Sequence, residues 1–151
     1  MSRLFRFASS HPVAAPRDAV FAVLEDAERW PSWWPQIRSV TPYDDVHGRA
    51  EIRSFLPLTL RIELATELVD AESGVLRATL AGDLVGWSQF ALRADGADRT
   101  ILDYTQEVRL GMPGLAGRLA ANPLARPVLI ANHAAMMRSG MRGLARAAAY
   151  R

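Results

Sequence analysis

The stretch LTLRIELA, residues 58–65, decides the fold. Its leucine and isoleucine side chains alternate with threonine, arginine, glutamate and alanine, which is the period-two pattern of a strand with one buried face. Similar alternation recurs from residue 37 to residue 110, interrupted by turn signals at residues 73–74, 82–83 and 95–98. Strands joined by such short turns predict an antiparallel meander.

Shorter elements precede this meander. Residues 3–14 predict a first strand, because phenylalanines alternate there with smaller or charged side chains. Pro16 then favours the start of a short helix, which is expected to end near Glu25 or Asp26. Prolines interrupt the tryptophan-rich segment WPSWWP, residues 30–35, so that any helix there is limited to a turn or two.

The segment VLIANHAAMMRSGMRGLARAAA, residues 128–149, predicts one long helix, since alanine, leucine, methionine and arginine are good helix formers. Pro123 and Pro127 are expected to break the chain before it. The sheet must cover its apolar face, and this helix is the only long element available as a cover. We therefore expect an α+β fold in which a strongly curved sheet and this helix leave space for a ligand.

The bulk properties of the chain narrow its class. Its 151 residues suit one domain, spanning residues 1–151, that is stable without a disulfide or a structural metal. Cysteine is absent, the three histidines are scattered in the sequence, and no nucleotide-binding motif occurs, so neither a metal nor a cofactor is expected. The charged N-terminus resembles neither a signal peptide nor a membrane span, which predicts a cytoplasmic protein without stable membrane insertion.

Charge is divided unevenly along the chain. Residues 1–107 hold 11 Arg against 16 Asp and Glu, a net charge of −5, whereas residues 108–151 hold 7 Arg and no acidic residue, a net charge of +7. Basic segments bind nucleic acids or anionic membranes when their charge is dense, but these arginines are spread among alanine and leucine. A solvated helix face is the simpler interpretation, and no nucleic-acid partner is expected. A homodimer is compatible with the sequence, although no residue pattern identifies an interface.

Over almost its whole length the sequence resembles the polyketide cyclase/dehydrase group of the START-like (SRPBCC) superfamily. The segments that carry the resemblance are PVAAPRDAVF at residues 12–21, Asp26, WPSW at 30–33, TILDY at 100–104, ARPV at 125–128, Asn132-His133, MMR at 136–138 and Gly143-Leu144. The resemblance implies the helix-grip fold, a curved antiparallel sheet wrapped around a long C-terminal helix, with two short helices near the N-terminus. It also implies an apolar cavity under the last helix, and no particular reaction.

Two residues are candidates for proton transfer in such a cavity. His133 has an ordinary pKa of about 6.5 and suits general acid–base catalysis if it faces a ligand. Alternatively, it is a core histidine that is hydrogen-bonded to a neighbour. Tyr104 is the second candidate, because it shares the apolar face of the last strand with Gln106, where polar side chains need partners. These two side chains either orient a carbonyl or hydroxyl of a ligand or pair with other core residues.

Further ligand contacts are expected from the apolar faces of the strands and of the long helix. Ser88 and Phe90 belong to this set if their strand turns its even-numbered side chains inward, whereas the other register places Trp87 and Gln89 inside. The tryptophans near residue 33 either form a wall of the cavity or simply pack the short helices against the sheet. The expected ligand-binding residues are Trp33, Trp34, Phe55, Leu60, Ile62, Leu64, Leu80, Ser88, Phe90, Tyr104, Gln106, Asn132, His133, Met136 and Met137.

Three hypotheses about function remain open from the sequence. The first is a protein that binds a small hydrophobic molecule, lipid-like or polyketide-like. The second is an aromatase/cyclase or dehydratase that uses His133 or Tyr104 for proton transfer, and the third is a module that docks a partner protein or membrane through its basic helix. Polar cavity groups within hydrogen-bond reach of one another favour the enzyme, a wholly apolar cavity favours the binding protein, and an exposed tryptophan patch without a cavity favours the docking module.

Overall fold

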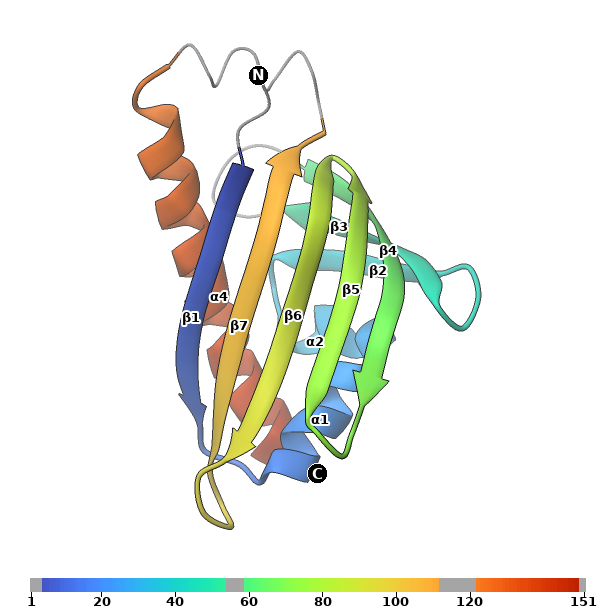
Figure 1. Ribbon diagram of the computed structural model, residues 1–151, viewed down its shortest axis with the longest axis vertical. Coiled ribbons are helices and arrows are strands. Elements are labelled where there is room, and N and C mark those ends of the chain that lie inside the picture. The colour runs from blue at the N-terminus through green and yellow to red at the C-terminus, as the bar shows by residue number, and fades with distance from the viewer. Residues whose placement is uncertain (1–3, 54–58, 112–121, 150–151) are drawn as a thin grey trace.

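A computed structural model describes residues 4–53, 59–111 and 122–149. Its main element is a seven-stranded antiparallel sheet in the order β1-β7-β6-β5-β4-β3-β2. The strands are β1 (Leu4–Val13), β2 (Ile37–Pro42), β3 (His47–Arg53), β4 (Thr59–Asp70), β5 (Val75–Gly82), β6 (Leu84–Ala94) and β7 (Thr100–Leu110). The helices are α1 (Arg17–Glu25), the short 3-10 helix η1 (Ala27–Arg29), α2 (Trp30–Trp33) and α4 (Ala125–Ala149). Figure 1 shows the sheet curving in front of α4, with α1 and α2 near the C-terminal end of that helix.

The strand order follows from the turns that the sequence predicts. Strands β2 to β7 are neighbours in the sheet in the same order as in the chain, which confirms the antiparallel meander. Strand β1 does not extend this meander at β2 but pairs with β7, with Phe5 opposite Val108. The first and last strands therefore meet in one half of the sheet, opposite the half that contains β2 and β3.

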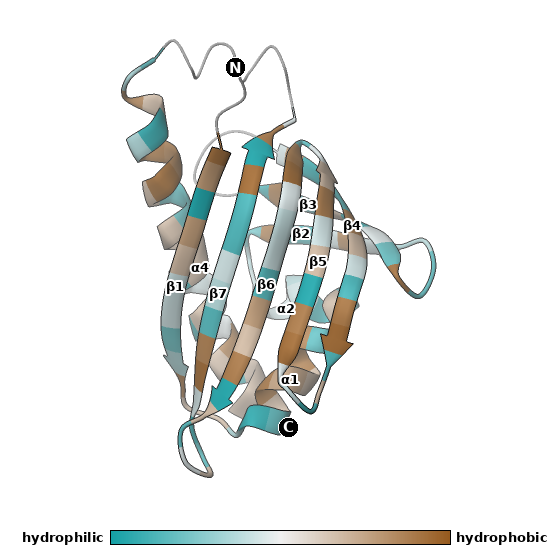
Figure 2. Cartoon of the chain, in the orientation of Figure 1, coloured by the Kyte–Doolittle hydropathy of each residue, from teal (hydrophilic) through white to brown (hydrophobic). Residues whose placement is uncertain are grey.

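Alternation along the strands separates a buried concave face from an outer face. In β7, Leu102, Tyr104 and Val108 are buried, whereas the acidic side chains between them are on the outer face. There Asp103 pairs with Arg93 at 2.8 Å, one of several ion pairs on that side of the sheet. Figure 2 shows the same alternation as apolar and polar bands along the strands.

The helices cover the concave face unequally. Helices α1 and α2 and the C-terminal half of α4 meet on one part of the sheet, where Leu24, Leu102 and Leu144 are fully buried. A second cluster of buried side chains, Phe5, Ile62, Leu80 and Val108, lies on another part of the sheet with Leu129 of α4 against it. The sheet is thus densely covered at one end only, which leaves room for a cavity between the clusters.

This architecture is the α+β helix-grip fold expected from the sequence, with one boundary predicted wrongly. Helix α4 begins at Ala125, so Pro127 lies within its first turn instead of breaking the chain ahead of residue 128. A proline is tolerated there because the first N–H groups of a helix have no partner within the helix. No helix in the described ranges is long and apolar enough to cross a membrane.

Candidate functional site

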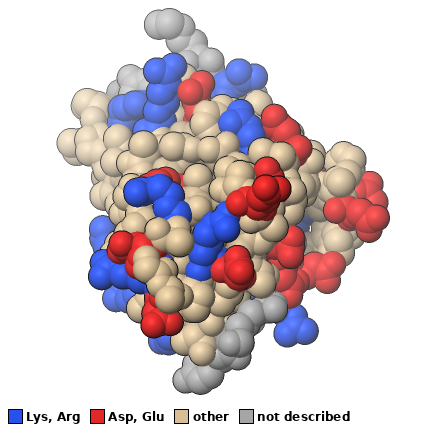
Figure 3. All heavy atoms as spheres, turned by 60° about the horizontal axis from the view of Figure 1, so that its bottom comes forward, with Lys and Arg blue, Asp and Glu red and all other residues tan. Residues whose placement is uncertain are grey.

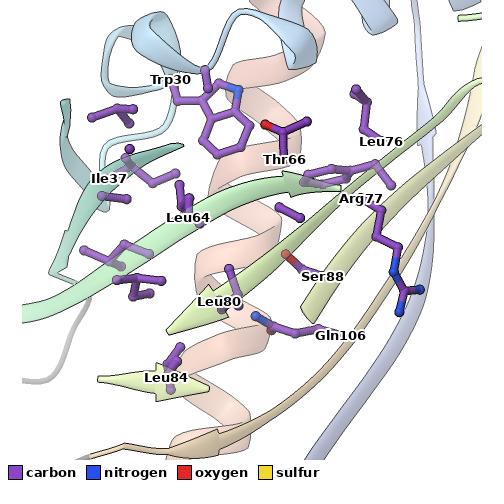
Figure 4. Close-up of a pocket in the computed structure, with 18 of the residues that line it drawn as sticks. Trp30, Ile37, Leu64, Thr66, Leu76, Arg77, Leu80, Leu84, Ser88 and Gln106 are labelled. Atoms are coloured by element: carbon purple, nitrogen blue, oxygen red, sulfur yellow. The ribbon is translucent and has the colours of Figure 1, made fainter. Parts of the chain in front are cut away.

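A cavity of about 440 Å³ lies between the concave face of the sheet and the N-terminal half of α4. Apolar side chains from successive strands form most of its wall, among them Leu64, Leu76, Leu80 and Leu84 (Figure 4). Aromatic side chains from β1, β6 and the helical segment 30–34 complete it, including Phe7, Phe90 and Trp30. The cavity is therefore lined mainly by side chains that favour a hydrophobic occupant.

Strand pairing decides which side chains of β6 reach this cavity. Ser88 is paired with Gln106 and Phe90 with Tyr104, and all four line the cavity. Trp87 lies on the outer face instead, where the Arg77 guanidinium carbon is 4.1 Å from the centroid of its ring. The structure thus selects the register with even-numbered side chains inward, between two registers that the sequence leaves open.

A small group of polar side chains interrupts the apolar wall. The Nε2 of His133 is 2.9 Å from the Oε1 of Gln106, and the imidazole stacks on Phe7 with ring centroids 3.7 Å apart. Burial lowers the pKa of His133 to about 4, so the imidazole is neutral at neutral pH. With Gln106 Oε1 as the acceptor, the proton of the neutral ring is on Nε2.

Tyr104 and Ser88 form the second part of this polar group. Burial raises the pKa of Tyr104 far above its usual value, and a hydrogen bond with the Ser88 side chain opposes this effect only in part. The phenol therefore remains protonated under all physiological conditions. Asn132 of α4 also lines the cavity. The interior thus offers hydroxyl, amide and imidazole groups, all of them uncharged.

The tryptophans of the segment 30–34 have different roles. Trp34 lines the cavity, is almost fully buried, and donates from Nε1 to the backbone oxygen of Met136 at 3.1 Å. Trp33, which we predicted as a ligand contact, is instead outside the described cavity lining and stacks on Trp34 with ring centroids 5.5 Å apart. Trp30 lines the cavity as well.

The structure brings the other predicted residues together in one place. Phe55 lies outside the described residues. The predicted residues that line the cavity are Trp34, Leu60, Ile62, Leu64, Leu80, Ser88, Phe90, Tyr104, Gln106, Asn132, His133, Met136 and Met137. Their place in the lining does not by itself establish contact with a ligand, so their role in binding stays a prediction.

Several lining residues were not in the predicted set. Phe5 and Phe7 of β1 and Val108 and Leu110 of β7 line the cavity. Their signal was present in the sequence, since each pair occupies alternate positions of a predicted strand. They were missed because the pairing of β1 with β7 joins residues about a hundred positions apart, which no local pattern shows.

Acidic side chains are part of the solvent-exposed lining of the cavity, together with the exposed apolar side chains of Val46, Leu68 and Val69. Glu25, Asp26 and Glu28 border the cavity on one side, and Asp44 and Asp45 border it from the turn between β2 and β3. Asp and Glu side chains gather at the right in Figure 3, the side to which this turn projects in Figure 1.

The cavity lining has little positive charge to balance these acidic side chains. Arg77 is the only arginine among the described lining residues. Its Nε is 3.3 Å from a carboxylate oxygen of Glu67, and its side chain points away from the cavity (Figure 4). Among the described residues, no three His, Cys, Asp or Glu side chains are placed to hold a metal ion.

Comparison with known proteins gives one family and several solved structures. Residues 5–149 match the family described as polyketide cyclase / dehydrase and lipid transport. The fold is similar to that of the Zhui aromatase/cyclase from Streptomyces sp. R1128, with a TM-score of 0.77, 20% identity and coverage of 97% of this chain and 94% of that one. No curated protein sequence matches the chain.

Two further structures share the fold at lower similarity. A START superfamily protein from Mycobacterium smegmatis superposes with a TM-score of 0.66 and 16% identity over 92% of this chain and 98% of that chain. Norcoclaurine synthase from Thalictrum flavum, in complex with dopamine and hydroxybenzaldehyde, superposes with a TM-score of 0.63 and 15% identity over 93% of this chain and 85% of that chain. At such identities the likeness extends to the START-like fold alone.

Proposed function

The chain belongs to the polyketide cyclase / dehydrase and lipid transport family, and from that premise we propose that its cavity binds one small, hydrophobic, uncharged molecule. The observation that carries this proposal is a group of neutral polar side chains set within the mainly apolar interior of the cavity. This polar group consists of Ser88, Tyr104, Gln106 and His133. Apolar walls with a few convergent polar groups are typical of small-molecule sites.

The size and lining of the cavity support a lipid-like or polyketide-like occupant. Its volume of about 440 Å³ falls within the range of small-molecule sites, roughly 300–1,000 Å³. Two methionines of α4, Met136 and Met137, face it, and their unbranched side chains adapt to ligands of varied shape. The expected partner is thus a small molecule. We expect it to bind within a single START-like domain that spans residues 1–151.

The polar group favours a ligand that carries a neutral oxygen, such as a ketone, phenol or alcohol. A ligand carboxylate would need a cation to offset its loss of hydration, and the described interior supplies neutral groups only. Exposed carboxylates that line the cavity, among them Glu28 and Asp45, would also repel an anionic ligand. The ligand is therefore expected to enter and bind without a negative charge.

Native mass spectrometry of the protein purified from its own host tests this proposal. A stoichiometric bound molecule, released and identified as an uncharged hydrophobic compound, is the expected result. A bound fatty acid or another anion would contradict the proposed ligand class.

If the mass spectrum shows protein without a bound molecule, a direct titration tests the same proposal. The neutral fluorescent probe N-phenyl-1-naphthylamine should bind, and 1-dodecanol should displace it at lower concentration than dodecanoate at pH 8. Failure of both compounds to displace the probe, or failure of the probe to bind, would contradict a hydrophobic ligand site.

An aromatase/cyclase or dehydratase activity is the second candidate. The contact between His133 and Gln106 favours it, because two polar cavity groups lie within hydrogen-bond reach of each other. The low pKa of His133, about 4, weighs against it, because a general base works best with a pKa near the operating pH. Turnover of a poly-β-ketone model substrate that His133→Leu abolishes would establish the enzyme, and binding without turnover would leave the binding protein.

A further inference from the structure

Two glycines of α4 make the close approach of the tryptophan segment possible. A Cβ at position 140 would lie 2.6 Å from Nε1 and 2.8 Å from Cδ2 of Trp34, closer than side-chain carbons approach in proteins. A Cβ at position 143 would overlap the backbone carbonyl of Trp33. Glycine weakens a helix interior by about 1 kcal/mol relative to alanine, so two glycines in α4 indicate that close packing outweighs helix propensity here.

Trp34 is therefore packed on several sides and is only 4% exposed. Its indole rests on the helix backbone at Gly140, stacks on Trp33, and donates from Nε1 to the backbone oxygen of Met136. Trp30 also packs on it, with ring centroids 6.4 Å apart, and part of Trp34 borders the cavity. Any side chain added at position 140 must push the indole toward the empty space, since packed protein on the other sides resists compression.

We propose that Gly140 and Trp34 together determine the size of ligand that the cavity accepts. The indole forms part of the cavity wall, and the absence of a side chain at position 140 lets it lie close to α4 and away from the cavity. The inference rests on the proposed function and adds a specificity-determining pair to it. Gly143 lies one turn further along α4 against backbone instead of a movable ring, so it contributes to packing and not to ligand size.

The test uses displacement of N-phenyl-1-naphthylamine by a series of straight-chain 1-alkanols of increasing length. Gly140→Ala should shift the preferred length downward and weaken the longest bound alkanol about tenfold relative to the shortest, which is what losing room for one to two methylene groups costs. Trp34→Phe should shift the preference toward longer alkanols, because the smaller ring opens the cavity wall at this position. The combined variant Gly140→Ala/Trp34→Phe should return close to the wild-type preference.

Gly143→Ala is the matched control. It should lower the melting temperature and leave the order of alkanol affinities unchanged. Equal weakening of all alkanols by Gly140→Ala, or the same shift in Gly143→Ala, would overturn the inference while leaving the ligand site intact. Wild-type protein that binds neither probe nor alkanols would instead overturn the proposed function. If Gly140→Ala does not fold, Trp34→Phe alone decides, and an unchanged length preference in that variant overturns the inference.

Discussion

The first and second halves of α4 meet different neighbours. In the first half, Leu129, His133 and Met136 face the cavity and are only partly buried. In the second half, Met141, Leu144 and Ala148 are buried in the core formed with α1 and α2. The first half of α4 thus covers the cavity, and the second half anchors the helix in the hydrophobic core. Substitutions of these three buried side chains should affect folding, whereas substitutions of the cavity-facing side chains in the first half should also affect binding.

The largest effect is expected in the anchoring half. Leu144 is fully buried, and Leu144→Ala leaves a cavity in the densest part of the core. Such substitutions cost about 2–5 kcal/mol of unfolding free energy. Urea denaturation followed by circular dichroism measures the change, and a loss below about 1 kcal/mol would show that this half is not the anchor.

In the first half of α4, His133 is expected to make the unfolding free energy depend on pH by a comparable amount. The pKa of His133 is about 4 in the folded protein, against an ordinary value of 6.5. Between these values the unfolded chain binds more protons, so the contribution of His133 to stability is complete above about pH 6.5 and is lost as the pH falls toward 4. The loss should reach at most about 3 kcal/mol.

Unfolding free energies measured from pH 7 to pH 4 check this expectation. His133→Leu should flatten the pH dependence over that range. Burial also lowers the pKa of His11, which lies outside the cavity lining. The variant His11→Asn therefore measures the separate contribution of that histidine to the pH dependence. An unchanged slope in His133→Leu would contradict the assigned burial of the imidazole.

A smaller loss of unfolding free energy is expected from removing the hydrogen bond between His133 and Gln106. Gln106→Leu leaves the Nε2–H of His133 buried without its acceptor, which costs about 1–3 kcal/mol. Replacing both residues by leucine removes donor and acceptor together and should be closer to neutral. A double-mutant cycle measures the coupling, and strictly additive effects would show that the two side chains do not interact.

The smallest effect is expected on the outer face of α4. Arg138 is exposed, and Arg138→Ala should change stability by no more than about 0.5 kcal/mol and leave probe affinity unchanged. Fluorescence titration and thermal melting measure both. A marked loss of affinity in this variant would move the functional site from the inner to the outer face of the helix.

The sequence predicts the meander, the long helix and part of the cavity lining, because each depends on local periodicity. Leu60, Ile62 and Leu64 alternate in β4 as expected, and Met136 and Met137 face inward as expected. Trp33 lies outside the lining, and the close approach of its backbone to Gly143 of α4 involves residues far apart in the chain, which no local pattern predicts. The polar contact between Gln106 and His133 likewise arises only when the last strand and the last helix meet.

The central claim, a ligand bound under the first half of α4, can be tested with methionine methyl NMR. Met136 and Met137 line the cavity, whereas Met141 lies one turn further along the helix, buried against the core and outside the described lining. On titration with 1-dodecanol, the methyl signals of Met136 and Met137 should shift in proportion to occupancy, and that of Met141 should hardly move. Binding that shifts Met141 as much as Met136, or that leaves both cavity methionines unchanged, would contradict the account.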